Sequence, residues 1–234
     1  FSVKAVAREG EKLTSIHESE GFISGFEAFD KIDLRSYAVK AAERALNMLK
    51  AKPAVKGRFK VVLDPKIAGT FIHEAVGHAC EADYIVTNQS ILCGKIGEQI
   101  GSEQVTIYDD STLNGGWGSA KYDDEGVPTE KRVLIENGVL KGYILNRETA
   151  KKLGLKSNGG ARAASYAHKP LVRMSNTYLS PKDYSFEELL EVVKEGIYVK
   201  GSRGGQVDPA KGVFQFSAEE AFLITKGEVS EPLL

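Results

Sequence analysis

The chain has 234 residues, of which 42% are hydrophobic, as in an ordinary globular protein. Lys and Arg total 31 and Asp and Glu total 32, so the net charge of −1 gives no electrostatic reason to expect binding to nucleic acid or to an anionic membrane. No segment approaches the roughly eighteen apolar residues of a membrane span. The two cysteines make a poor disulfide framework, which favours a cytosolic, reducing environment and hence a cytoplasmic location.

The first part of the chain predicts three strands, a helix, a fourth strand and the start of a second helix. The strands are short, partly alternating and separated by Gly-bearing turns, as antiparallel strands are: residues 2–8, 12–17 and 21–29. Helical spacing of apolar residues then runs through 34–49, with Asp33 as a candidate N-cap. Residues 58–63 read as a buried strand, and Pro65 suits an early position of a helix that continues to His73.

The rest of the chain predicts further short strands with one more helix. Residues 86–126 are rich in Gly, Asp and Ser and predict loops around one strand. Asn137-Gly138 predicts a hairpin turn, because both residues tolerate positive φ. Ser185 and Glu188 form a candidate capping box for a helix over 185–196. The remaining strand candidates are residues 104–108, 132–135, 139–145, 171–179, 213–217, 221–225 and 228–230. The expected fold class is α+β, with mostly antiparallel short strands and about three or four helices.

The segment from residue 71 to residue 78 carries the candidate chemistry, because it reads H-E-x-x-x-H. His73 and His78 are good zinc ligands in their neutral form. Zn²⁺ lowers the pKa of bound water to about 7, and Glu74 beside the first histidine is placed to act as the general base. The alternative is a structural role, in which both histidines are core residues of a buried helix.

The spacing of the two histidines requires a distorted helix. Five residues of a regular α-helix advance about 500°, so the two imidazoles would diverge by about 140°. Gly77, directly before His78, is the expected place for a π-bulge that returns both rings to one side.

Several blocks in the same order resemble the TldD-type zinc metalloproteases of the TldD/PmbA (modulator of DNA gyrase) family. The blocks lie at residues 72–83, 123–128, 135–143, 165–168, 173–178 and 204–208. The resemblance implies a zinc peptidase that acts on unfolded or short peptides, with His73 and His78 as ligands and Glu74 as the base. It also implies an oligomer, either of this chain or with a paralogous subunit.

The resemblance further implies a third zinc ligand, a Cys in a Cys-Gly-Lys type segment near the C-terminus. Cys80 and Cys93 do not match that position. The expected organisation is therefore the end of an N-terminal region at residues 1–56, followed by a metalloprotease core at 57–234 that is incomplete at its C-terminus. On this basis the isolated chain is expected to show little peptidase activity, and the alternative function is a non-catalytic peptide-binding or subunit-interaction module.

Other polar residues are candidates for supporting roles. Glu81, with Asp83, is expected either to be solvated or cap-like or to orient a ligating histidine. His168 is expected to be an ordinary hydrogen-bonded histidine, or else to contact substrate or stabilise an oxyanion. Arg162 and Arg173 are candidates for binding a peptide carboxylate, with surface salt bridges as the alternative.

Overall fold

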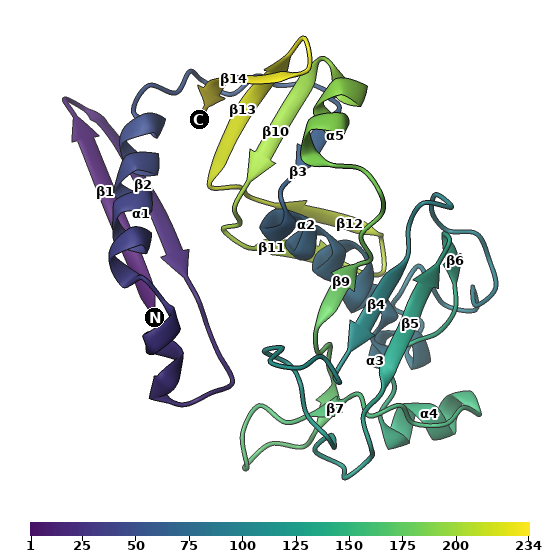
Figure 1. The fold of residues 1–234 in the computed structure, drawn as a ribbon. Coiled ribbons are helices and arrows are strands. Elements are labelled where there is room, and N and C mark those ends of the chain that lie inside the picture. The colour runs from purple at the N-terminus through teal and green to yellow at the C-terminus, as the bar shows by residue number, and fades with distance from the viewer. The chain divides into compact units, whose positions relative to one another are not determined.

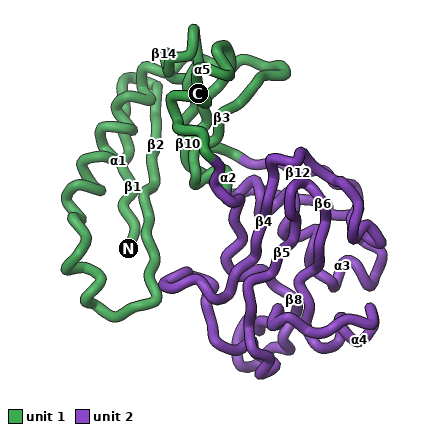
Figure 2. Tube along the Cα trace, turned by 45° about the vertical axis from the view of Figure 1, so that its right-hand side comes forward, with its two compact units in different colours: residues 1–68, 183–204, 217–234 green, residues 69–182, 205–216 purple.

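The computed structural model describes residues 1–234 and has five α-helices among short strands that mostly pair antiparallel (Figure 1). The expected α+β class is confirmed, with slightly more helices than expected. No helix combines the length and apolar character needed to cross a membrane. The chain divides into two compact units, residues 1–68, 183–204 and 217–234 in the first and residues 69–182 and 205–216 in the second (Figure 2). The division expected at residue 56 between an N-terminal region and a metalloprotease core stays a prediction.

The first unit begins with a hairpin covered by a helix. Strands β1 (Ser2–Glu9) and β2 (Lys12–Ser19) pair antiparallel, and α1 (Leu34–Met48) packs on them through Ala41, Ala45 and Met48. Asp33 caps α1 as expected, because its carboxylate accepts a hydrogen bond from the Ser36 N–H.

The strand expected at residues 21–29 is wrong. Residues Phe26–Lys31 form a 3₁₀ helix, η1, without a buried residue. The Glu27 carboxylate accepts a hydrogen bond from the Gly25 N–H, which closes a local turn and leaves the segment without a strand partner.

A four-stranded sheet completes the first unit, in the order β14-β13-β10-β3. Its strands are β3 (Val61–Leu63), β10 (Gly196–Lys200), β13 (Glu220–Thr225) and β14 (Glu228–Leu233). Helix α5 (Phe186–Val193) has the expected Ser185 capping box but ends before residue 196, because Gly196 begins β10. The sequence did not indicate β10, which pairs parallel with β3 and antiparallel with β13.

The second unit is built around a sheet in the order β6-β5-β4-β9. The strands are β4 (Ile107–Asp110), β5 (Lys131–Glu136), β6 (Val139–Leu140) and β9 (Thr177–Leu179). The turn between β5 and β6 has positive φ at Asn137 (49°) and Gly138 (78°), which confirms the hairpin. The single strand expected at 171–179 is instead two, because β8 (Leu171–Val172) pairs with β7 (Ala161–Arg162) whereas β9 pairs with β4.

Three further elements of the second unit surround the H-E-x-x-x-H segment. Helix α3 (Ala82–Val86) follows it, and the hairpin β11 (Gly205–Asp208) and β12 (Val213–Phe216) packs on it. Helix α4 (Arg147–Leu153) was not expected from the sequence, although Asn146 and Thr149 form its capping box and Gly154 ends it with a φ of 67°. The apolar core beneath the segment includes Ile72, Ala79, Cys80, Ile144 and Met174.

Candidate metal centre

A π-helical turn brings the two histidines of the motif together. Helix α2 (Pro65–Ile72) continues into the π turn η2 (His73–Gly77), in which the His78 N–H donates to the His73 carbonyl, five residues back. The two imidazole centroids are 4.6 Å apart and nearly perpendicular. Ligand atoms of His73, Glu74 and His78 all lie within 4.8 Å of one another. The expected distortion near Gly77 is thus confirmed, and the histidines do not diverge.

Neighbouring residues pack closely on the π turn at two glycines, Gly77 and Gly205. The Met174 thioether packs directly on Gly77, where an added Cβ would overlap the sulfur. On the other side, an added Cβ on Gly205 of β11 would lie 2.6 Å from the Glu74 Cγ. Glu74 is 8% exposed as a result of this packing. Backbone from β11 therefore covers the candidate base closely.

The two histidines have pKa values displaced in opposite directions. Loss of solvent around the ring lowers the pKa of His73, and the neighbouring His78 lowers it further. The hydrogen bond to Glu81 raises the pKa of His78, against the opposing effect of burial. The lowered pKa of His73 favours its neutral form, the form in which imidazole ligates a metal.

Glu81 is almost fully buried and contacts the second histidine. It is 1% exposed, and its Oε2 lies 2.9 Å from His78 Nδ1. Its Oε1 is buried without a hydrogen-bond partner, and the nearest cation is Arg173 Nη1 at 3.9 Å. The solvated interpretation of Glu81 is wrong, because the side chain is buried. Glu81 does occupy the N-cap position of α3, although its side chain makes no cap hydrogen bond. Its contact leaves His78 Nε2 available for a metal.

The other residues that flank the motif do not join the group. Asp83 Oδ2 accepts a hydrogen bond from the Val172 N–H, and burial raises the pKa of Asp83. Cys80 is buried, and burial raises the pKa of its thiol. Neither Cys80 nor Cys93 belongs to the cluster of possible ligands, and both thiols are free.

A buried ion pair that sequence reasoning missed lies next to the centre. Arg132 Nη2 lies 2.7 Å from Asp109 Oδ2, and both side chains are at most 2% exposed. Asp109 also accepts hydrogen bonds from Ser175 and Thr177. The negative charge of Asp109 acts to raise the pKa of His73. The sequence feature that could have indicated this pair is Asp109-Asp110, directly after the strand candidate at residues 104–108.

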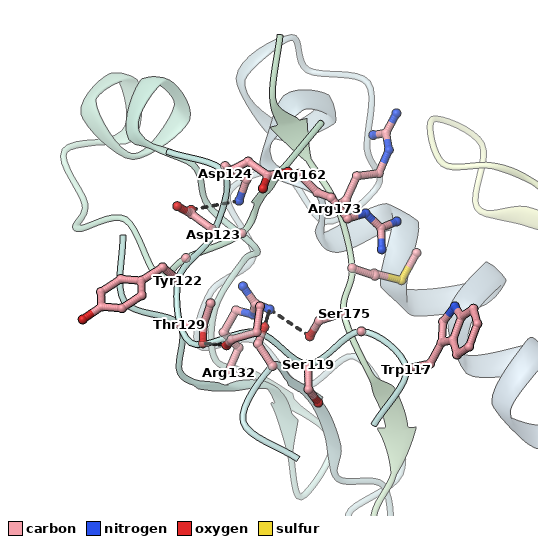
Figure 3. A pocket seen from close by; sticks show the side chains of 17 residues that line it. Trp117, Ser119, Tyr122, Asp123, Asp124, Thr129, Arg132, Arg162, Arg173 and Ser175 are labelled. Carbon is pink, nitrogen blue, oxygen red and sulfur yellow. Dashed lines mark hydrogen bonds between the residues drawn. The ribbon is translucent and has the colours of Figure 1, made fainter. Parts of the chain in front are cut away.

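The remaining candidates lie in pockets beside the centre rather than in the ligand cluster. Arg162 and Arg173 are neighbours on one side of a pocket of about 260 Å³, which Arg132 also lines (Figure 3). The same two arginines line an adjoining pocket with His168. His168 is exposed, and its Nδ1 lies 2.8 Å from Ser165 Oγ.

Comparison with known proteins identifies the family of this chain. Residues 56–234 match the family described as PmbA/TldA metallopeptidase C-terminal domain. The chain belongs to this family. The resemblance to TldD/PmbA proteins is thereby confirmed.

Relatives of the family cover nearly all of this chain. A metalloprotease of Methanocaldococcus jannaschii is 54% identical over 233 residues, which are 99% of this chain and 51% of that protein. A zinc metalloprotease TldD homolog of Saccharolobus solfataricus is 37% identical, over 100% of this chain and 52% of that protein. The crystal structure of TldE from Thermococcus kodakarensis superposes with a TM-score of 0.82 at 27% identity, over 99% of this chain and 52% of that one. The chain thus spans about half the length of these relatives.

Proposed function

We propose that this chain carries the metal-binding and proton-transfer groups of a zinc-dependent peptidase that cleaves unfolded or short peptides. The observation that carries the proposal is the π turn, which gathers ligand atoms of His73, Glu74 and His78 within 4.8 Å. A tetrahedral zinc ion with bonds of about 2.1 Å needs ligand atoms about 3.4 Å apart. Small rotations of the two exposed or half-buried imidazoles close that difference, so the residues present fit the ion.

Each residue of the cluster has a separate task in this proposal. His73 and His78 would hold Zn²⁺, and His78 would offer Nε2 because its Nδ1 faces Glu81. The ion supplies a Lewis acid that lowers the pKa of water toward about 7 and polarises the scissile carbonyl. Glu74 accepts the proton of the attacking water at its carboxylate and returns it to the leaving amine nitrogen. Glu81 holds the His78 ring in one tautomer and orientation.

The third protein ligand that the resemblance implies is a Cys thiolate. Cys80 and Cys93 lie outside the cluster, so neither is assigned this role. We further propose a cytoplasmic protein, in keeping with two free thiols, and an assembly with a second copy or a paralogous subunit. The structural likeness to TldE supports the paralogous arrangement.

Zinc content and hydrolysis of the full-length protein test the proposal together. The wild-type protein should hold zinc in stoichiometric amounts and cleave an unstructured peptide. His73→Ala and His78→Ala should lose both, because each removes one of few strong ligands. His17→Ala is the matched control, since His17 is an exposed histidine of β2. Retention of zinc and turnover in both ligand variants would refute the assignment. Zinc and peptide binding without hydrolysis by the wild type would favour the non-catalytic alternative.

A further inference from the structure

Four basic residues line one pocket beside the candidate metal centre. The pocket has a volume of about 380 Å³, and its lining contains Arg162, His168, Lys169 and Arg173. The other lining residues are alanines and Leu171, and the lining has no carboxylate. We call this site the basic pocket. Its composition contrasts with the net charge of −1 for the whole chain.

The short hairpin β7–β8 places the two arginines on one face. Arg162 is paired with Leu171, and Ala161 with Val172, so Arg173 follows on the same side as Arg162. Ala161 and Val172 point the other way and are buried, at 4% and 0% exposed. Cross-strand diagonal neighbours of this kind lie about 7–8 Å apart, within reach of one small anion between two long side chains.

The cationic charge of the basic pocket is largely available to a ligand. Arg162 has no ion pair or side-chain hydrogen bond, and its side chain is exposed. Arg173 donates to the Val172 carbonyl, lies 3.9 Å from Glu81 and also feels the charge of Asp83. Lys169 pairs with Glu148 in an exposed contact, which contributes little and exchanges readily with another anion.

Two further acidic side chains accept hydrogen bonds from backbone N–H groups in the walls of the basic pocket. Asp124 Oδ2 accepts from the Ala163 N–H at 2.7 Å. Asp83 Oδ2 accepts from the Val172 N–H at 3.1 Å. These hydrogen bonds hold the walls of the pocket in place.

Direct contacts connect the basic pocket to the metal centre. Arg173 is the residue of the pocket nearest Glu81, and Glu81 in turn contacts His78. The next residue, Met174, packs on Gly77 of the π turn. A ligand held by Arg173 is therefore placed close to the residues that carry the proposed chemistry.

We propose that the basic pocket binds a carboxylate of the peptide substrate, through Arg162 and Arg173. The proposal rests on the proposed peptidase function and adds a substrate class to it, namely peptides with a free C-terminal carboxylate or an acidic side chain near the cleaved bond. The planar guanidinium matches a carboxylate with two parallel N–H···O bonds, which favours a carboxylate ligand at two adjacent arginines. Leu171, 44% exposed between them on the same face, offers apolar contact to the residue that bears the carboxylate.

Peptide binding can be measured apart from hydrolysis. The full-length protein with Glu74→Gln would be titrated with four octapeptides of one sequence that carry a neutral N-terminal dye. The set combines a free or amidated C-terminus with Glu or Gln near the C-terminal end. The peptide with the recognised carboxylate should bind about tenfold more tightly than its neutral counterpart, the usual value of a charge-assisted hydrogen bond. If amidation of the C-terminus weakens binding, the recognised group is the C-terminal carboxylate. If replacement of Glu by Gln weakens binding, the recognised group is the acidic side chain.

Substitutions in the protein then locate the effect. Arg162→Ala should remove the preference for the anionic peptide, and Arg162→Lys should retain part of it. Arg35→Ala is the matched control, because Arg35 is an exposed arginine of α1. Equal binding of all four peptides, or an unchanged preference in Arg162→Ala, would overturn the proposal. Failure of the peptidase function appears separately, as absent zinc or absent turnover in the wild type with the carboxylate preference intact.

Discussion

At the scale of single residues, Glu74 offers the most direct test of the proposed chemistry. It is buried against Gly205 and lies next to both histidines. Glu74→Gln keeps the shape of the side chain and removes the base. Turnover should fall by about 10²–10⁴-fold, the usual contribution of general acid–base catalysis, while zinc stays bound. Steady-state kinetics and metal analysis on the same preparation measure both. Unchanged turnover would remove Glu74 from the mechanism.

Glu81 acts on zinc through His78, so its substitution should change metal affinity. Glu81→Ala removes the acceptor at His78 Nδ1 and should weaken zinc binding by about 10–100-fold, as for other partners of ligating histidines. Glu81→Gln should have a smaller effect, because an amide oxygen still accepts the hydrogen bond. Competition with a chelator of known affinity gives the dissociation constants. Identical zinc affinities in all three proteins would contradict the role.

The same contact predicts a change in the protonation of His78 in the metal-free protein. Glu81 is the main cause of the raised pKa of His78, so Glu81→Gln should lower that pKa. The sign follows because a charged acceptor stabilises imidazolium and a neutral one does so less. The shift can be followed by NMR titration of the histidine ring protons.

At the scale of elements, the π turn depends on a glycine that faces a neighbouring side chain. In Gly77→Ala the new Cβ meets the Met174 thioether, and the turn or Met174 must move. The free energy of unfolding should fall by about 1–3 kcal/mol, the usual cost of overpacking a core, and zinc affinity should fall with it. Denaturant unfolding and chelator competition measure the two effects.

Gly69 gives the control within the same helix. It lies in α2, and an added Cβ there meets nothing within 4 Å. Gly69→Ala should raise the free energy of unfolding by up to about 1 kcal/mol, because Ala favours the helix over Gly. A loss of stability in Gly69→Ala equal to that in Gly77→Ala would mean that the effect is general to the helix and not a property of the π turn.

At the scale of the whole molecule, one arginine connects three distant parts of the first unit. Arg44 on α1 pairs with Glu18 of β2 and with Glu219 and Glu220 at the start of β13. These carboxylates raise the pKa of Arg44, although burial opposes them. Arg44→Ala leaves the buried Glu219 and Glu220 with only a lysine each, at 3.9 Å. The free energy of unfolding should therefore fall by about 3–5 kcal/mol.

The exposed pair of Lys52 and Glu231 is the control for this loss. Both side chains are more than half exposed, so Lys52→Ala should lower the free energy of unfolding by less than about 1 kcal/mol. Denaturant titration of the two variants measures the difference. Equal losses would show that the ion pairs of Arg44 have no special weight in the stability of the unit.

The sequence alone determined the features that depend on local chemistry. The identities and order of His73, Glu74 and His78 predict metal-assisted chemistry, and the five-residue spacing requires the non-α turn that is observed. The sequence also predicted the helix caps at Asp33 and Ser185 and the turn at Asn137-Gly138, because each of these features depends on residues a few positions apart.

Only the tertiary structure decided features that join distant segments. Burial of Glu81 against the backbone of Ile144 turns an acid that reads as solvated into the partner of His78. The pairing of β10 with β3, far apart in the chain, has no local signal. Arg162 and Arg173 share a face because β7 and β8 pair in one register, and a shift by one residue would separate them. Local chemistry is set by neighbours along the chain, whereas burial, register and charge pairing depend on which segments meet when the chain folds.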